Sequence, residues 1–385
     1  MKVADRFAGM EQSDIRIVMN RALALEARGA EVAHLEIGQP NFDTPEPIKE
    51  AAMAALARGE TGYGPSAGIT PLRAMLARSM SARHHLTIET ERVLVTNGAS
   101  EAIYVALSTV VNPGDEVAIL EPCWPNHVGM VKLLGAVVRF ISTRAEDDFQ
   151  PTTAAINAGL SARTKALIVN TPNNPTGSVL SLASMEMLAS EARRRNLLIV
   201  ADEVYDRFLY KEAVPSIACL PDMAARTAIV NAFSKTYAMT GWRLGYVALP
   251  TGLVGAAGLT HTYINTSVNT FIQYGALAAL SQCETDIERM RESYRQRRDS
   301  AIEALSAMHG VSHTVPDGGL FVFPHLGGDD REIARRLLDE ANVATVPGSA
   351  FGPSGRGHLR ISFCASEEVL ERGLVLMQRW LEAQR

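Results

Sequence analysis

The chain has 385 residues, of which 47% are hydrophobic and 21% are charged, and its formal net charge is -5. This length exceeds the size at which a single hydrophobic core keeps growing, so we expect two domains. The mild negative charge argues against nucleic acid or an anionic membrane as the main partner, although local arginines can still hold a small anionic ligand.

The first twenty residues lack the layout of a signal peptide, and no apolar stretch approaches the roughly 20 residues needed to cross a bilayer. The four cysteines lie far apart and in no Cys-x-x-Cys spacing, so neither a zinc site nor a disulfide framework is indicated. The histidines show no His-Glu-x-x-His pattern and are interpreted as surface residues or satisfied core residues. We therefore expect a cytoplasmic protein with reduced thiols, no metal site and no membrane partner.

The first predicted element is a helix over residues 14–28. Further along, short runs rich in β-branched residues alternate with stretches of helical period, and most of these runs are nearly continuously apolar, as in strands covered on both faces. This alternation predicts an α/β fold with a mainly parallel seven-stranded sheet covered by helices. The expected strands are residues 92–96, 116–120, 136–141, 165–170, 197–202, 227–232 and 245–249, with helices that include 100–110 and 182–195.

The pattern changes after about residue 270. A long helical run reaches about residue 308, a Gly-rich strand-like piece follows at 318–323, and helices are expected around 331–341 and at 367–383. These elements describe a smaller α+β domain. We expect an N-terminal segment of residues 1–45 that packs with it, a large domain of residues 46–290 and a small C-terminal domain of residues 291–385.

The segment NAFSKTYAMTGWRLGY, residues 231–246, places Lys235 directly after a strand that we expect to be buried. A lone lysine in such a place is most often a solvated charge. Here its neighbours are small and apolar, and burial lowers the pKa of an amine, which suits a nucleophile toward an aldehyde. Arg243 offers a second cation for an anion, and Gly245 lets the backbone approach closely. The segment suggests a phosphorylated aldehyde as the ligand.

Chemically compatible residues follow or close the ends of other predicted strands. Asp202 ends a buried strand, where a carboxylate needs a partner, be it a salt bridge, a helix N-cap or a ligand. Gly98 lies in a strand-helix turn that suits a phosphate or is simply tight, and Trp124 follows another strand. The carboxyl ends of parallel strands form the ligand crevice of such a sheet. We therefore expect these residues to line one site.

SKTYAMTGWRLG resembles the cofactor-lysine signature of the class I aminotransferases, the fold-type I pyridoxal-phosphate enzymes. The resemblance extends from about residue 35 to residue 363. It implies that Lys235 is the catalytic residue, carrying pyridoxal 5'-phosphate as a Schiff base, and that Arg243 binds the phosphate. TPNNPTG, residues 171–177, matches the family's Asn-Pro-x-Asn-Pro-Thr-Gly element except at Thr171, which replaces asparagine.

The resemblance also assigns the remaining contacts to the cofactor. Around the phosphate it assigns the turn formed by Gly98, Ala99 and Ser100. One departure is Ala232, where many members have a serine, and Ser234 is the candidate replacement. Around the ring, it pairs Asp202 with the pyridine nitrogen and lets Tyr205 donate to the phenolic oxygen. Asn174 would lie beside that oxygen and the substrate carboxylate. Trp124 would stack on the ring and face the substrate.

On the substrate side, the resemblance assigns Arg360 in HLRISF to the α-carboxylate of an amino acid. Gly38 in EIGQPNFDTP would place its backbone against the same carboxylate. Tyr63 in TGYGPSAG matches a tyrosine that reaches the phosphate of the neighbouring subunit. The resemblance therefore implies a homodimer with shared active sites.

The expected activity is an aminotransferase that moves the amino group of an L-amino acid to a 2-oxo acid such as 2-oxoglutarate, with aspartate as the leading donor. A β-eliminating C–S lyase on the same fold is the alternative, because it shares most of these residues. A ligand-binding regulator on this fold normally carries an additional DNA-binding domain, for which no length remains. A nicotinamide dehydrogenase is disfavoured because no Gly-x-Gly-x-x-Gly follows a predicted strand.

Overall fold

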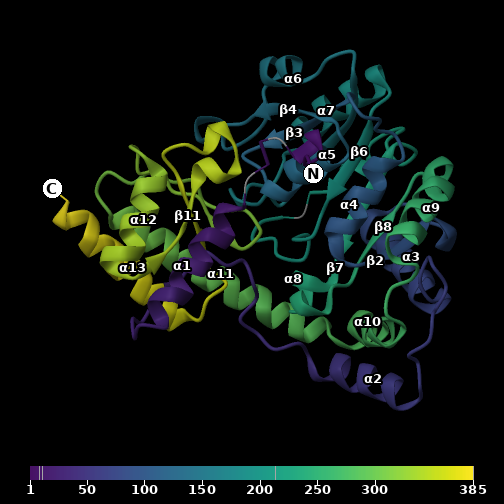
Figure 1. Cartoon of the computed structure of the whole chain (residues 1–385), viewed down its shortest axis with the longest axis horizontal. Helices are drawn as coiled ribbons and strands as arrows, with labels where there is room; N and C mark the ends of the chain where they lie inside the picture. The colour runs from purple at the N-terminus through teal and green to yellow at the C-terminus, as the bar shows by residue number, and fades with distance from the viewer. Residues whose placement is uncertain (8, 11, 213, 385) are drawn as a thin grey trace.

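Seven strands form the central sheet of the protein, for which the computed structural model describes residues 1–7, 9–10, 12–212 and 214–384. The spatial order is β2-β8-β7-β6-β5-β3-β4, and β8 alone runs antiparallel to its neighbours (Figure 1). The prediction of a mainly parallel seven-stranded sheet is confirmed. The strands are β2 (Val93–Thr96), β3 (Glu116–Glu121), β4 (Val137–Ser142), β5 (Thr164–Asn170), β6 (Leu198–Asp202), β7 (Thr227–Ala232) and β8 (Gly245–Ala248).

The apolar character of the strands follows from helices on both faces of the sheet. In β5, Ile168 packs into the cluster shared with α4 and α5, whereas Leu167 and Val169 pack into the cluster shared with α7. Successive side chains of a strand point to opposite faces, so both sets must be apolar. β4 is only partly buried, because it is an edge strand. The helices of this body are α2 (Glu46–Ala57), α3 (Thr70–His84), α4 (Gly98–Ser108), α5 (Pro125–Leu133), α6 (Thr153–Gly159), α7 (Leu182–Arg195), α8 (Phe233–Thr236), α9 (Val254–Asn265) and α10 (Thr270–Gln282).

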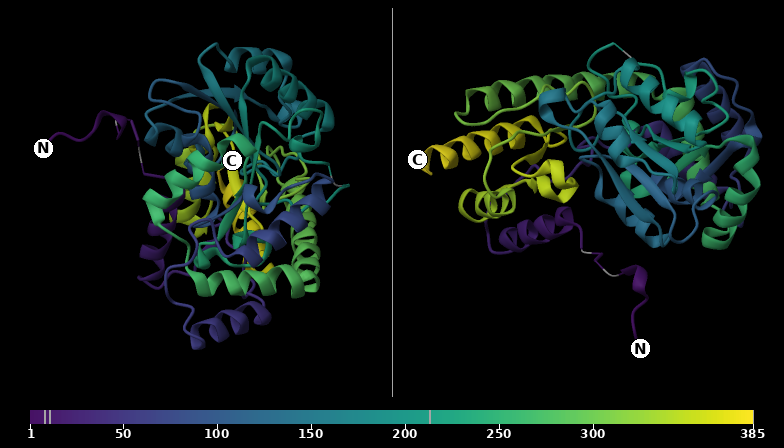
Figure 2. Two further views of the ribbon diagram at one scale, coloured as in Figure 1. Left: turned by 90° about the vertical axis from the view of Figure 1, so that its right-hand side faces the viewer. Right: turned by 90° about the horizontal axis from the view of Figure 1, so that it is seen from above.

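The C-terminal elements form a second, smaller body, beside which the N-terminal helix lies in Figures 1 and 2. Strand β1 pairs in parallel with β10, so the N-terminal segment joins this body through backbone hydrogen bonds. β12 pairs antiparallel with both β11 and β9. The elements are α1 (Asp14–Glu26), β1 (Ala33–His34), α11 (Glu284–Ala307), β9 (Phe321–Val322), α12 (Asp330–Ala341), β10 (Val343–Ala344), β11 (Val346–Pro347), β12 (Leu359–Ser362) and α13 (Glu367–Ala383).

Two predicted elements differ in detail. The helical run expected from residue 270 to about 308 is two helices, because the backbone leaves the helical conformation at Cys283 (φ -109, ψ 20). The strand expected at 318–323 shortens to β9, since Gly319 has a positive φ of 72. Helix α11 connects the two bodies: Ile287 packs in the core beside the sheet, and Met290 packs in the core of the smaller body. The domain boundaries at 45/46 and 290/291 stay predictions.

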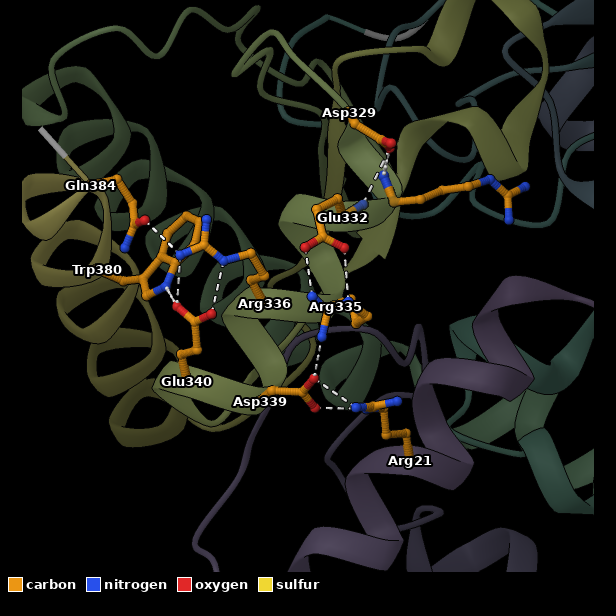
Figure 3. Close-up of polar contacts among 10 residues, drawn as sticks. Arg21, Asp329, Glu332, Arg335, Arg336, Asp339, Glu340, Trp380 and Gln384 are labelled. Carbon is orange, nitrogen blue, oxygen red and sulfur yellow. Dashed lines mark hydrogen bonds and ion pairs between the residues drawn. The ribbon is translucent and has the colours of Figure 1, made fainter.

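Helix α12 is joined to both α1 and α13 by a network of ion pairs and hydrogen bonds (Figure 3). Arg21 of α1 binds Asp339 at 2.6 Å, and Asp339 also pairs with Arg335. On the other side, the indole nitrogen of Trp380 donates to Glu340 at 2.8 Å. Single exposed pairs contribute little, but several that share partners fix the relative position of three helices. Within the described residues, no helix is long and apolar enough to span a membrane.

Candidate active site

A cavity of about 610 Å³ lies between the carboxyl ends of the parallel strands and the smaller body. Two predicted site residues are not in its lining. Gly98 lies directly behind the Arg243 guanidinium, and Tyr63 is 92% exposed, away from the cavity of its own chain. The structure brings the other predicted residues together: Gly38, Ala99, Ser100, Trp124, Asn174, Asp202, Tyr205, Ser234, Lys235, Arg243 and Arg360 all line the cavity.

Lys235 enters the cavity from α8, the short helix that follows β7. Its Nζ donates a 2.6 Å hydrogen bond to the carbonyl oxygen of Gly38, which reaches the site from the N-terminal segment. Burial lowers the pKa of Lys235 to about 8, and the nearby Arg360 and Arg243 guanidiniums act in the same direction. Roughly a tenth of the amine is therefore unprotonated at pH 7, far more than for a solvated lysine, which favours a role as nucleophile or general base.

Asp202 closes β6 with a buried carboxylate that is only half satisfied. Its Oδ2 lies 2.9 Å from Nε2 of His127, while its Oδ1 has no hydrogen-bond partner among the described residues. The ring of Trp124 packs edge-on against the His127 ring, with centroids 5.4 Å apart. A buried, unpaired carboxylate oxygen is costly, so it indicates a site for a ligand that carries an N–H group or a positive charge.

His127 is a core histidine whose contact with Asp202 the sequence did not indicate. It is fully buried, and its Nδ1 has no partner among the described residues. The sequence does not predict this contact, because it joins residues 75 positions apart. One available signal was its place just beyond Trp124, after a strand end.

The start of α4 and Arg243 form a cradle for an anion. Gly98 begins α4 with a φ of +77, and a Cβ placed there would lie 2.6 Å from Nη2 of Arg243. Gly245 allows the same close approach from the other side, because its Cβ would lie 2.5 Å from the carbonyl carbon of Gly98. Unpaired N–H groups at a helix start beside a guanidinium suit a phosphate.

Arg360 projects from β12 and is only 2% exposed. Its guanidinium lies between the rings of Phe321 and Phe351, at 4.4 and 5.0 Å from their centroids. It donates to Asn174 Oδ1 at 3.1 Å and to the carbonyl oxygen of Glu36. Burial lowers the pKa of Arg360 to about 10, and its Nε has no partner among the described residues. A buried cation with a free donor is suited to a carboxylate ligand.

The loop that carries Asn174 is attached to the sheet next to Asp202. Asn170 at the end of β5 accepts a hydrogen bond from the backbone N–H of Asn174 and donates to the carbonyl oxygen of Asp202, both at 2.9 Å. Tyr205 lies three residues after Asp202 and is buried. Burial raises the pKa of its hydroxyl above the usual value of 10. The Tyr205 hydroxyl is therefore a hydrogen-bond donor at neutral pH.

Helix α1 closes one side of the cavity, which the sequence did not predict. Its contribution comes from Ile15, Arg16 and Met19, together with Ser13 just before the helix. An amphipathic helix of this kind carries no local signal that distinguishes a face over a cavity from a face over a core.

Comparison with known proteins agrees with this geometry. The family described as aminotransferase class I and II matches residues 30–375. The aspartate/prephenate aminotransferase of Thermus thermophilus is 38% identical over 383 residues, which cover 98% of each chain. The aspartate aminotransferase of Thermotoga maritima is 36% identical over 363 residues, which cover 94% of this chain and 95% of that protein. The structure of the aspartate aminotransferase from Thermus thermophilus with maleate superposes with a TM-score of 0.93 at 37% identity, covering 98% of this chain and 99% of that one.

The chain therefore belongs to the family of class I and II aminotransferases. Enzymes of this family use pyridoxal 5'-phosphate. The residues of the cavity fit that cofactor: an amine at Lys235, an unpaired carboxylate oxygen at Asp202 for a protonated ring nitrogen, and the cradle of Gly98 and Arg243 for a phosphate.

Proposed function

We propose that this enzyme moves the amino group of L-aspartate to a 2-oxo acid such as 2-oxoglutarate. The observation that carries the proposal is the meeting of Lys235 and Arg360 in one cavity with the half-satisfied carboxylate of Asp202. Lys235 supplies a base, Arg360 binds a carboxylate, and Asp202 pairs with a cationic ring. The preference for aspartate rests on the relatives named as aspartate aminotransferases.

Lys235 has two tasks in this proposal. It would hold the cofactor covalently, and its freed Nζ would move a proton from the Cα of the substrate to the aldehyde carbon of the cofactor. Pyridoxal phosphate, when bound, supplies a protonated ring that accepts the electron pair left at Cα. A positioned proton transfer of this kind commonly contributes on the order of 10²–10⁴-fold. The lowered pKa of Lys235, about 8, supports the role.

Asp202 keeps the ring nitrogen protonated through its free Oδ1, and His127 holds the carboxylate in place through Oδ2. Tyr205 and Asn174 serve the phenolic oxygen of the cofactor, and Trp124 covers its ring and borders the substrate. Their common exposure to the cavity supports these assignments.

The phosphate is held by the backbone N–H groups at Gly98, Ala99 and Ser100, by Arg243 and by the hydroxyl of Ser234, which takes the place of the serine absent at Ala232. The positive φ of Gly98 and its contact with Arg243 support this cradle.

Arg360 binds the α-carboxylate of the substrate, and the backbone at Gly38 lies against the same group. A Cβ at Gly38 would lie 2.4 Å from the ring of Phe321, so this segment approaches the site only as glycine. Binding of the carboxylate to the free donors of Arg360 would satisfy a guanidinium that is otherwise short of partners.

The enzyme is a homodimer in which Tyr63 reaches the phosphate of the neighbouring active site. Two surface features support this proposal: the exposed ring of Tyr63 and the exposed apolar side chains of Met53, Tyr263 and Ile264. Sedimentation should give a dimer, and Tyr63→Phe should weaken cofactor binding without changing the sedimentation coefficient. We further propose a cytoplasmic location, supported by four cysteines that are all free thiols.

The experiment that tests the function is a panel of amino donors assayed with 2-oxoglutarate. Aspartate should give the highest kcat/KM, with glutamate as the second product. Incubation with cysteine or cystathionine and no acceptor separates the lyase alternative, because a β-eliminating lyase releases pyruvate and an aminotransferase stops after one turnover.

A further inference from the structure

Four basic side chains line the active-site cavity, and three of them have tasks in the proposed function. These are Lys235, Arg243 and Arg360, and the fourth is Arg16 of α1. Asp202 is the only acidic residue in the lining, as far as the structure describes the chain. A cavity with this excess of positive charge favours a ligand that brings more than one anionic group.

The helix geometry turns Arg16 toward the site. Residues 15, 16 and 19 lie on one face of a helix because its period is 3.6 residues, and Ile15 and Met19 line the same cavity. Arg16 therefore lines the cavity together with two apolar residues, whose side chains suit the methylene groups of a substrate.

Two ion pairs hold α1 in this orientation. Asp14 binds Arg331 at 2.9 Å and Arg21 binds Asp339, both partners being on α12 (Figure 3 shows the second pair). Arg16 itself is exposed, and its guanidinium contacts no acceptor within the part of the chain that the structure describes. α1 is fixed by its other charged residues, while Arg16 keeps its five N–H donors available.

We propose that Arg16 binds the side-chain carboxylate of a dicarboxylic substrate, which makes it a residue that determines specificity for aspartate and 2-oxoglutarate. Arg360 holds the α-carboxylate from the buried side of the cavity, and Arg16 meets the second carboxylate from α1. The planar guanidinium offers a two-point contact to that group. This inference rests on the proposed function, whose substrate it explains.

The test compares Arg16→Gln with Arg28→Gln in the holoenzyme. Arg28 lies just beyond α1, is exposed and does not line the cavity, so its replacement removes the same charge elsewhere. The half-reaction with each donor alone is followed by the absorbance of the bound cofactor. Arg16→Gln should lower kcat/KM for aspartate on the order of ten- to a hundredfold and leave alanine within about twofold. Arg28→Gln should leave both donors within about twofold.

A second measurement uses binding without turnover. Succinate, a dicarboxylate that carries no amine, should inhibit Arg16→Gln more weakly by a similar factor, and butyrate should inhibit wild type and variant alike. Equal losses for aspartate and alanine, no loss at all, or an equal effect of Arg28→Gln would overturn the inference. A wild type that uses alanine but no dicarboxylic donor also overturns it and leaves the aminotransferase assignment intact. A wild type that transfers from no donor contradicts the proposed function itself.

Discussion

His127 Nε2 lies 2.9 Å from Asp202 Oδ2, and the two side chains are 0% and 3% exposed. The contact uses one carboxylate oxygen, and the other oxygen of this cavity-lining residue has no partner among the described residues. The imidazole therefore fixes the direction of the carboxylate and does not occupy the oxygen that a ring nitrogen would use.

Asp202→Asn tests this arrangement. The amide cannot keep a ring nitrogen protonated, so kcat/KM for aspartate should fall by more than about a hundredfold, in the range of a lost charge-assisted contact at the reacting group. The cofactor-free variant should melt no lower than the wild type, because the substitution removes an underpartnered buried charge. His127→Asn should cost less activity than Asp202→Asn. A lower Tm with unchanged kinetics would mean that Asp202 is only structural.

Gly98→Ala should weaken the binding of pyridoxal phosphate by at least about tenfold, because the new Cβ would displace Nη2 of Arg243 from the cradle. Gly114→Ala is the matched control: Gly114 also has a positive φ, of +87, but open space around the Cβ position. Both variants carry the same kind of backbone strain. The dissociation constant of the cofactor is measured by fluorescence titration of cofactor-free protein. An equal loss of affinity in the two variants would contradict the role of Gly98 and Arg243 in binding the phosphate.

The lowered pKa of Lys235 predicts how the cofactor becomes attached. Only the unprotonated amine attacks an aldehyde, so the rate at which cofactor-free protein bonds to pyridoxal phosphate should rise with pH and level off above about 8. Stopped-flow absorbance measures this rate. A rate that still climbs toward pH 10.5, the ordinary value for lysine, would indicate a solvated amine.

The raised pKa of His34 predicts that the stability of the protein depends on pH. His34 lies where the N-terminal segment joins the smaller body. Its Nδ1 lies 2.8 Å from Oε1 of the buried Glu36, and this hydrogen bond, together with Glu26, raises the pKa of His34 from 6.5 to about 9. A raised pKa means that the contribution to stability is complete below pH 6.5 and disappears as the pH rises through about 9. The Tm should therefore fall more over this interval in the wild type than in His34→Gln. Parallel Tm profiles would exclude the linkage.

Much of the fold follows from local patterns in the sequence. Most of the seven strands are recognisable because they must be apolar on both faces, and Asp202, Trp124 and Lys235 follow because parallel strands end at one edge. Arg360 and Gly38 come from other segments and were indicated by the family resemblance. The break at Cys283 could not be predicted, since the apolar pattern continues through it and the change is confined to one residue's backbone angles.

Other parts of the site depend on contacts between distant segments. Arg16 reaches the cavity because α1 packs on the smaller body through Ala22 and is paired with α12 through Asp14 and Arg21. The pairing of His127 with Asp202 likewise joins the first turn of α5 to the end of β6, 75 residues further along the chain. Such contacts are set by tertiary packing, so a sequence pattern indicates the residue type but not its partner.

Whether Lys235 carries the cofactor is tested most directly by chemical trapping. The enzyme containing pyridoxal phosphate is treated with borohydride, and the modified peptide is mapped by mass spectrometry. Reduction makes the link between cofactor and lysine permanent. We expect one modified residue, Lys235, and no adduct in Lys235→Ala, which should also lose turnover. An intact adduct on another lysine of an active enzyme would contradict this assignment.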